Sequence, residues 1–374
     1  MRMIIAAGGT GGHLYPALAV VESIQANHPD TPLIFIGTVG GFERPLIEKA
    51  NIAFSGHYEV SAGPIHGVNP FKAIVSAFKL MRGTWQSFRI LGKEKPNVIL
   101  STGGWEGLPV ALSARLRGVP LMIYLPDIEP GLTIKVLRLF AKKVAVTVAD
   151  SQKFFRDGQT IVTGYPLRKL MTNATREAGI AHFGLNPAKK TLLVFGGSRG
   201  ARAINIGIGN ILGDLLKDDI QVLHVTGTLD YERLNEQIGD LKNHPNYHVF
   251  DYLHDDMGLA MACADLCVCR AGASVLGEFP FFKLPSILIP LAYSWHYQQV
   301  NADYFAGRGA AIHLDETKMD AELLPTIRAV LGDSARLSVM SEAVSQSASS
   351  TGAQNLAEAL VALATEHAQR RGTR

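Results

Sequence analysis

Two glycine-rich segments directly follow apolar runs and have the composition of anion-binding turns. The first reads GGTGGH over residues 8–13, and the second reads GGSRGA over residues 196–201. Where such a turn leads from a strand into a helix, its free N–H groups and the helix dipole attract negative charge. The second segment, with the Ser198 hydroxyl as a further donor, predicts a phosphate site. A glycine turn that only permits strand–helix packing would have the same composition.

The first segment ends in His13 and has the spacing of neither a dinucleotide fingerprint nor a P-loop. An imidazole at the start of a helix is disfavoured as a cation by the helix dipole, so it stays neutral and can accept a proton. His13 is therefore a candidate general base. The alternative is a histidine that only caps the helix.

Two polar side chains of the second half could bind a sugar. Glu278 lies six residues after Gly272, within the helix that is expected to follow a strand. This placement is similar to that of the acidic group that binds the ribose hydroxyls in Rossmann proteins, although the position differs. Gln298, in the polar stretch 295–302, offers both a donor and an acceptor. The alternatives are a solvated helical glutamate and an ordinary polar helix start.

The segment 60–105 is basic and apolar, and Glu94 is its only acidic residue. Such a pattern is typical of a helix that docks on an anionic membrane surface, and residues 134–143 could extend it. A core-packing helix with a cationic outer face is the alternative. The basic residues are Lys72, Lys79, Arg82, Arg89, Lys93 and Lys95, interleaved with Phe71, Ile74, Val75, Phe78, Leu80, Met81, Trp85, Phe88 and Ile90.

The cysteines and the apolar runs limit the class of protein. Cys263, Cys267 and Cys269 lack the partners of a zinc site and cannot form a disulfide framework, so we expect core residues, no metal site and a reducing cytoplasmic compartment. Gly, Pro or charge interrupts every apolar run before the ~20 residues of a membrane span. The net charge of +3 is too small to indicate nucleic acid.

Short apolar runs that alternate with helix-length amphipathic segments position these residues. The pattern is typical of an α/β protein with parallel sheets, and 374 residues with 47% hydrophobic content suit two domains. Both halves open with a strand, a glycine turn and a helix, which predicts two Rossmann-like domains with a ligand cleft between them. The expected strands are Met3–Ala7, Leu33–Ile36, Val98–Ser101, Leu121–Leu125, Lys143–Thr147, Thr191–Phe195, Gln221–Thr226, His248–Tyr252, Leu266–Cys269 and Ser286–Pro290.

Composition shifts predict the domain limits. We expect an N-terminal domain with the membrane-docking segment over 1–165, a polar linker over 166–190, and a C-terminal domain with the phosphate and sugar candidates over 191–345. An alanine-rich helix and a basic tail follow over 346–374.

Taken together, the motifs resemble those of the MurG-type enzymes of glycosyltransferase family 28, and the resemblance covers nearly the whole chain. Each motif alone is weak, but their number and order are specific. They are GGTGGH with Pro16 and Ala17, STGG over 101–104, GLT over 131–133, GYPLR over 164–168, GGSRGA, Asp255-Asp256-Met257, CRAGAS with Glu278, and QQVNA over 298–302.

The resemblance implies a GT-B fold, two Rossmann-like domains that face a central cleft, and inverting transfer of N-acetylglucosamine from UDP-GlcNAc to undecaprenyl-pyrophosphoryl-MurNAc-pentapeptide, the step from lipid I to lipid II. It implies no cofactor and leaves a divalent metal requirement open. The enzyme would lie at the cytoplasmic face of the plasma membrane. His13 would be the base and Thr10, Gly11 and Gly12 would serve the acceptor. The donor residues would be Arg168, Ser198, Leu253, His254, Ala273, Ser274, Val275, Leu276, Gly277, Glu278 and Gln298.

The chain departs from the family pattern at two motifs. Where the family usually reads His-Glu-Gln-Asn, this chain has Tyr124-Leu125-Pro126-Asp127, so the acidic Asp127 would meet an anionic lipid diphosphate. Tyr165 replaces the usual Asn of Gly-Asn-Pro. A transferase for a different lipid acceptor is therefore an alternative, as are a UDP-GlcNAc 2-epimerase of the same architecture and a non-catalytic nucleotide-sugar binding protein.

Overall fold

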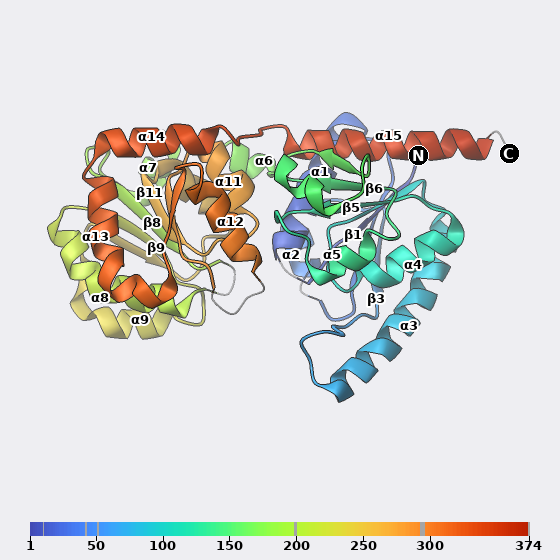
Figure 1. Cartoon of the computed structure of the whole chain (residues 1–374), viewed down its shortest axis with the longest axis horizontal. Coiled ribbons are helices and arrows are strands. Elements are labelled where there is room, and N and C mark those ends of the chain that lie inside the picture. Colours follow the sequence, from blue (N-terminus) through green and yellow to red (C-terminus); the bar gives the residue numbers. More distant parts are fainter. Residues whose placement is uncertain (10, 42, 51, 198–199, 292–295, 373–374) are drawn as a thin grey trace. The chain divides into compact units, whose positions relative to one another are not determined.

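The computed structural model describes residues 1–374 except 10, 42, 51, 198–199, 292–295 and 373–374 (Figure 1). It divides the chain into two compact units. The first comprises Met1–Arg168 and Ser350–Arg374, and the second comprises Lys169–Ser349. Each unit has a parallel sheet with helices connecting its strands, which confirms the α/β class and the two Rossmann-like domains.

The sheet of the first unit has seven strands in the order β3-β2-β1-β4-β5-β6-β7, all parallel. Its strands are β1 (Met3–Ala6), β2 (Leu33–Thr38), β3 (Gly56–Val60), β4 (Val98–Ser101), β5 (Leu121–Leu125), β6 (Lys143–Val146) and β7 (Thr160–Val162). The α-helices are α1 (Gly11–Asn27), α2 (Glu43–Lys49), α3 (Pro70–Glu94), α4 (Gly107–Arg117), α5 (Leu132–Leu137) and α15 (Gly352–Gly372).

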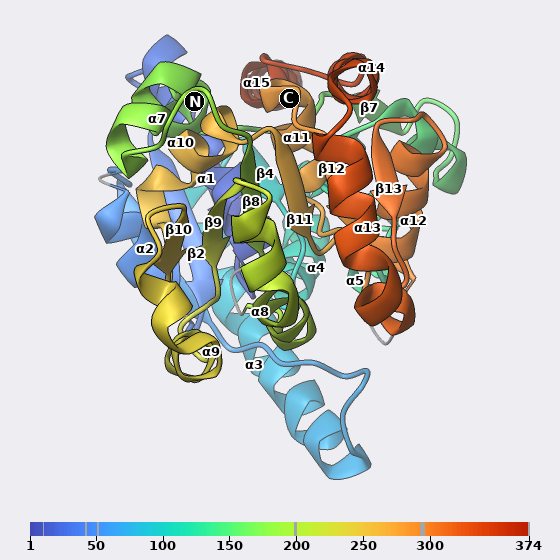
Figure 2. The same cartoon turned by 90° about the vertical axis from the view of Figure 1, so that its left-hand side faces the viewer.

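The sheet of the second unit has six parallel strands in the order β10-β9-β8-β11-β12-β13, which can be followed in Figure 2. Its strands are β8 (Thr191–Phe195), β9 (Gln221–Val225), β10 (Tyr247–Phe250), β11 (Leu266–Cys269), β12 (Ser286–Leu288) and β13 (Ala311–His313). The α-helices are α6 (Lys169–Thr172), α7 (Arg176–Phe183), α8 (Arg202–Lys217), α9 (Tyr231–Ile238), α10 (Met257–Cys263), α11 (Val275–Phe282), α12 (Tyr297–Ala306), α13 (Met319–Leu331) and α14 (Ser334–Ser345).

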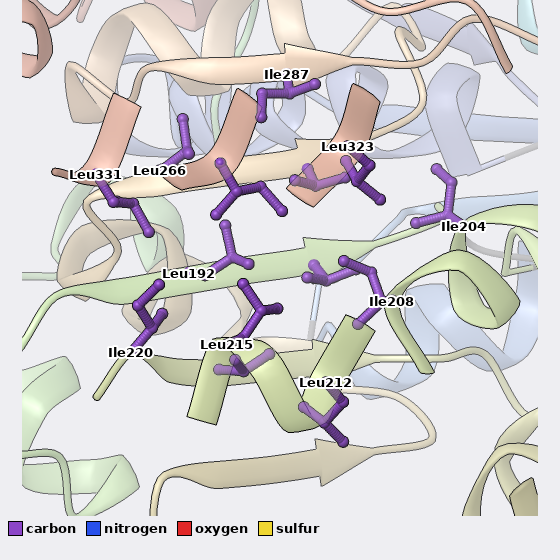
Figure 3. Packing of buried hydrophobic residues seen from close by; sticks show 14 of the residues in the cluster. Leu192, Ile204, Ile208, Leu212, Leu215, Ile220, Leu266, Ile287, Leu323 and Leu331 are labelled. Carbon is purple, nitrogen blue, oxygen red and sulfur yellow. The ribbon is translucent and has the colours of Figure 1, made fainter. Parts of the chain in front are cut away.

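Helix periodicity builds the core of the second unit. Ile204, Ile208, Leu212 and Leu215 recur every three or four residues along α8, so they form one stripe that packs against the sheet, where Leu192 is among its partners (Figure 3). Burial of each such side chain contributes about 1.5–3 kcal/mol relative to an exposed position. This packing holds the start of α8 at the carboxyl end of β8.

The chain passes between the units at two places. The expected linker, 166–190, contains α6 and α7, and from Lys169 onward it is part of the second unit. The C-terminal helix α15 belongs to the first unit and packs against α1. There the Asn355 side chain donates a 3.0 Å hydrogen bond to the carbonyl oxygen of Thr163.

All ten expected strands are present, with ends that differ by up to two residues. The structure adds β3, β7 and β13. The three cysteines are buried and free. Among the described residues, no helix combines the length and the apolar character needed to cross a bilayer.

Candidate functional site

The loops with candidate catalytic residues lie at the carboxyl edge of the first sheet. Because β1 is flanked by β2 on one side and β4 on the other, the winding of the chain reverses between β1 and β4. Ligands of open α/β sheets bind at this reversal. The loops that follow β1, β2, β4 and β5 bring His13, Glu43, Glu106 and Asp127 to this edge.

His13 has the geometry of a neutral base. Its Nδ1 lies 3.2 Å from the carbonyl oxygen of Gly8. A carbonyl oxygen only accepts, so Nδ1 carries the proton and Nε2 is left with its lone pair. Burial lowers the pKa of His13, and the bond to Gly8 opposes this effect. The Nε2 atom points toward Gly103, where it lies 3.4 Å from the position that a β-carbon would take.

Two buried glutamates beside this loop were not anticipated. The side chains of Glu43 and Glu106 belong to residues that are only 3% and 2% exposed. Glu43 Oε1 accepts a 3.2 Å hydrogen bond from the N–H of Gly9. Burial, with a smaller contribution from Glu43, raises the pKa of Glu106 to about 8. One Glu106 oxygen, Oε1, is buried without a hydrogen-bond partner among the described residues.

Glycines from three loops make room for these two carboxyls. A β-carbon on Gly8 would lie 2.3 Å from Glu43 Oε1 and 3.1 Å from Glu106 Cδ. A β-carbon on Gly41 or Gly104 would overlap Glu43 or Glu106 respectively. The signal in the sequence was present as a repeat, because residues 40–43 read GGFE after β2 and residues 103–106 read GGWE after β4.

The remaining acceptor-side residues and the donor-side candidate Arg168 have separate positions in the first unit. Gly11 and Gly12 begin α1, and Thr10 lies outside the described residues. Asp127 is half-buried just beyond the end of β5. Arg168 belongs to the first unit, where its Nε donates a 2.9 Å hydrogen bond to the Glu22 carboxylate on α1. The sequence did not indicate this ion pair.

The described glycines of the turn after β8 have backbone angles or surroundings that favour glycine. Gly197 and Gly200 have φ angles of +88° and +74°, which favour glycine. A β-carbon on Gly200 would lie 2.4 Å from the carbonyl oxygen of Thr226, and one on Gly196 only 2.0 Å from the amide nitrogen of Ala201. Among the described residues, no side-chain hydrogen bond caps the start of α8 at Ala201. The N–H groups there are available to an anion; Ser198 itself lies outside the described residues.

A network of buried polar residues binds Thr226, the residue next to Gly200 of this turn. His224 Nε2 lies 3.0 Å from Asn205 Oδ1, and Asn205 Nδ2 donates a 2.9 Å hydrogen bond to the carbonyl oxygen of Thr226. The second ring nitrogen of His224 lies 3.1 Å from the Tyr247 hydroxyl. Burial lowers the pKa of His224 to about 3, so it is neutral. The sequence reading missed this network, because its members look like ordinary strand and helix residues.

A second helix start, that of α11, carries the candidate ribose carboxylate. Ala273 and Ser274 lead into α11, where Val275, Leu276 and Gly277 are buried and Glu278 is half-buried. Burial raises the pKa of Glu278 to about 7, and a hydrogen bond with Ser274 opposes this effect.

The other donor-side candidates follow β10 and β12. Leu253 is buried, and His254 has a φ of +44° and packs its ring against Tyr252, with centroids 4.5 Å apart. Gln298 Oε1 accepts a 3.0 Å hydrogen bond from the N–H of Leu291. Across the described part of the chain, no three His, Cys, Asp or Glu side chains gather to hold a metal ion.

A separate surface on α3 has its large apolar side chains on the exposed face of the helix and not on the buried face. Its buried face consists mainly of small residues, with Ser76, Gly83 and Ser87 among them. Its large apolar side chains face outward, and both views show its N-terminal part extending beyond the other elements of the first unit (Figures 1 and 2). We call this the α3 surface: Phe71, Ile74, Val75, Phe78, Met81, Trp85 and Phe88, exposed by 37–76%, with exposed Lys72, Lys79, Arg82, Arg89 and Lys93.

The α3 surface is smaller than the docking surface that the sequence predicts. Leu80 is buried on the inner face of α3 and Ile90 is half-buried. The segment 134–143 is not one helix, because α5 ends at Leu137. Leu139 beyond it is exposed.

Comparison with known proteins gives one family for both units. The glycosyltransferase family 28 N-terminal domain matches residues 3–146, and the family's C-terminal domain matches residues 191–358. A relative from Desulfitobacterium hafniense (strain Y51), 37% identical over 350 residues, is named UDP-N-acetylglucosamine--N-acetylmuramyl-(pentapeptide) pyrophosphoryl-undecaprenol N-acetylglucosamine transferase. The match covers 92% of this chain and 94% of that protein.

Two solved structures are similar over nearly the whole chain. The crystal structure of Acinetobacter baumannii MurG has a TM-score of 0.74 at 25% identity and covers 96% of this chain and 98% of its own. A UDP-GlcNAc 2-epimerase from Neisseria meningitidis, bound to UDP-GlcNAc, has a TM-score of 0.70 at 11% identity and covers 96% of this chain and 100% of its own. The second likeness is one of fold alone.

Proposed function

Because the chain belongs to glycosyltransferase family 28, we propose that it transfers N-acetylglucosamine from UDP-GlcNAc to undecaprenyl-pyrophosphoryl-MurNAc-pentapeptide. The observation that carries this proposal is the 37% identity, over 92% of the chain, to a transferase of that name. The fold shared with the epimerase at 11% identity does not favour the epimerase activity.

The second unit binds the donor in this proposal. The glycine turn after β8 and the uncapped start of α8 supply N–H groups for the diphosphate, and Ser198 adds a hydroxyl. Glu278 binds the ribose, and Leu253 or His254 lies beside the uracil. The residues from Ala273 to Gly277 form the helix start near the phosphates, and Gln298 holds the sugar hydroxyls. The anchoring of Gln298 by Leu291 supports this role, because it fixes the amide in one orientation.

The first unit supplies the base and the acceptor site. The acceptor's sugar hydroxyl gives its proton to Nε2 of His13 as its oxygen forms a bond to the anomeric carbon of GlcNAc. The bond from that carbon to the UDP oxygen breaks on the opposite face, and UDP leaves with the electron pair. Helix N-termini and backbone amides stabilise the charge that develops on the diphosphate, with Arg168 as a further cation. Thr10, Gly11, Gly12 and Asp127 contact the acceptor. No cofactor takes part, because UDP-GlcNAc is itself the activated substrate.

The α3 surface docks the enzyme on the membrane that holds its acceptor. Exposed aromatic and aliphatic side chains enter the interface while the flanking lysines and arginines meet anionic head groups. This supports a peripheral position at the cytoplasmic face of the plasma membrane.

Transfer of labelled GlcNAc from UDP-GlcNAc to the purified lipid-linked pentapeptide acceptor tests the proposal. We expect labelled product to form with inverted anomeric configuration. If UDP-GlcNAc binds without transfer to this acceptor, other polyprenyl-diphosphate sugars are tested next, and transfer to one of them identifies the alternative acceptor. Formation of UDP-N-acetylmannosamine would instead identify an epimerase, and binding alone would identify a non-catalytic protein.

A further inference from the structure

The peptide group between Gly8 and Gly9 makes hydrogen bonds on both sides. Its N–H, from Gly9, donates to Glu43 Oε1 at 3.2 Å, and its C=O, from Gly8, accepts from His13 Nδ1 at 3.2 Å. The three groups therefore form one chain: carboxylate, peptide, imidazole. Hydrogen bonds in such a chain polarise and strengthen one another.

We propose that Glu43 is the positioning residue of the base, and that it acts on His13 through the Gly8–Gly9 peptide. The carboxylate draws the N–H of Gly9, which makes the carbonyl oxygen of Gly8 a better acceptor. That oxygen then holds the proton on Nδ1 of His13 and keeps Nε2 free to accept the proton of the acceptor hydroxyl. Glu43 touches neither substrate in this arrangement, and the inference rests on the proposed function through the role of His13.

The surroundings of Glu43 support this assignment over a purely structural one. Glu43 is only 3% exposed, and a buried carboxylate is costly unless hydrogen bonds and neighbours compensate for the lost water. The glycines Gly8 and Gly41 leave the space that its oxygens occupy. Side-chain burial for packing alone would be served by an apolar residue, which avoids this cost.

Glu106 completes the site as the neutral partner. Its carboxyl lies beside that of Glu43, because both approach the same point next to Gly8. Two carboxylates this close repel one another, and a shared environment of this kind keeps one of them protonated. Glu106 is the protonated member at neutral pH, since its pKa is about 8. With Glu106 neutral, the negative charge of the pair lies on Glu43, the residue that contacts Gly9.

The tautomer of His13 can be measured without any substrate. Two-dimensional ¹H–¹⁵N NMR of the histidine side chains reports which ring nitrogen carries the proton, and a His13→Asn variant identifies the His13 signals among the 12 histidines. We expect the Nδ1–H form to predominate in the wild-type protein. In Glu43→Gln, which keeps the shape and removes the charge, the Nε2–H fraction should rise severalfold.

The same variant separates positioning from binding in the transfer assay. We expect kcat to fall about 10-fold with little change in KM for UDP-GlcNAc, because the base is lost only in part. Glu48→Gln is the matched control, since Glu48 lies on the same helix α2, is exposed and pairs with Arg44. The control should leave both kcat and the tautomer unchanged.

Two outcomes would overturn the proposal. One is a His13 tautomer ratio in Glu43→Gln that equals that of the wild type, and the other is a predominant Nε2–H form in the wild type. If Glu43→Gln does not fold, Glu43→Asp provides the same test, because the shorter side chain withdraws the carboxylate from Gly9. A wild-type enzyme that transfers no GlcNAc would refute the proposed function instead, and the NMR result would still decide the link between Glu43 and His13.

Discussion

Tyr124 and Tyr165 pack edge to face in the core of the first unit, with ring centroids 6.3 Å apart and planes inclined by 71°. They are residues at which the chain departs from the family motifs. Both are buried, and the Tyr124 hydroxyl shares a 2.8 Å hydrogen bond with Thr147. The two residues that differ from the family motifs therefore contact one another inside the fold. In the altered segment 124–127, Tyr124, Leu125 and Pro126 are buried. Asp127 is half-buried, so it is the residue of this segment that can contact the acceptor.

Asp127→Asn should improve the use of an undecaprenyl-diphosphate acceptor. The substitution removes a negative charge that faces an anionic group and supplies an amide donor. We expect KM for the acceptor to fall by up to about 10-fold, or ~1.4 kcal/mol, while KM for UDP-GlcNAc stays the same. Initial rates at varied acceptor concentration measure the effect. An unchanged or higher acceptor KM would remove Asp127 from the acceptor site.

His13→Ala should reduce kcat by about 10²–10⁴-fold, the usual contribution of a general base. Binding of UDP-GlcNAc, measured by calorimetry, should not change, because His13 is not one of the residues assigned to the donor. His28, a half-buried histidine just beyond the C-terminal end of the same helix, gives the control His28→Ala. Full activity in His13→Ala would refute the base assignment.

Glu106 should make the protein less stable as pH rises. Its pKa is raised from 4.5 to about 8, so the folded state holds a proton that the unfolded chain has lost. This stabilisation is complete below about pH 4.5 and is lost as pH rises through about 8, by at most about 1.4 kcal/mol per pH unit. Denaturant unfolding between pH 5 and 8 measures the slope. Glu106→Gln should reduce the slope of the free energy of unfolding against pH, whereas the exposed control Glu59→Gln should not. Equal slopes in the wild type and Glu106→Gln would contradict the prediction.

Donor binding should weaken below neutral pH through Glu278. Its pKa is raised to about 7, and only the ionised carboxylate accepts hydrogen bonds from both ribose hydroxyls. We expect Kd for UDP-GlcNAc to increase as pH falls from 8 to 6, by no more than about 10-fold per pH unit. Calorimetric titrations of the wild type and of Glu278→Gln measure Kd for UDP-GlcNAc at each pH. A variant that retains the pH dependence of the wild type would assign it to another group.

Reversal of charge on the α3 surface should prevent membrane binding. Lys79→Glu, Arg82→Glu and Arg89→Glu together should weaken binding to anionic liposomes by at least about 100-fold at low salt, because each basic residue contributes ~1 kcal/mol. The triple control Lys49→Glu, Lys153→Glu and Arg156→Glu changes net charge equally at exposed positions elsewhere in the same unit. Cosedimentation with vesicles measures both. Equal losses in the two triples would reduce the effect to net charge alone.

The sequence predicted the central strands well and the edges poorly. The three unanticipated strands β3, β7 and β13 all lie at sheet edges. Central parallel strands are covered on both faces and read as continuous apolar runs, whereas an edge strand can be short and polar. The segment GHYEV of β3 alternates between half-buried and exposed positions until Val60. Its strand character comes from pairing with β2, which the local sequence does not reveal.

The residues of the candidate site that the sequence did not reveal also depend on contacts between distant segments. Glycine turns and His13 were recognised because their chemistry follows from type and position. Glu43 and Glu106 were overlooked, since a glutamate near a helix start normally faces solvent. Their burial arises from glycines in other loops, as with Gly8 beside both carboxyls. Only the fold brings these segments together.

The return of α15 to the first unit fixes an order of events during synthesis. Its partner α1 is made before the second unit, and α15 is made after it. The whole second unit, Lys169–Ser349, leaves the ribosome between them. In the nascent chain, the α15-binding side of α1 therefore stays uncovered until α15 has been made, while the second unit, continuous in sequence, is free to complete its core earlier.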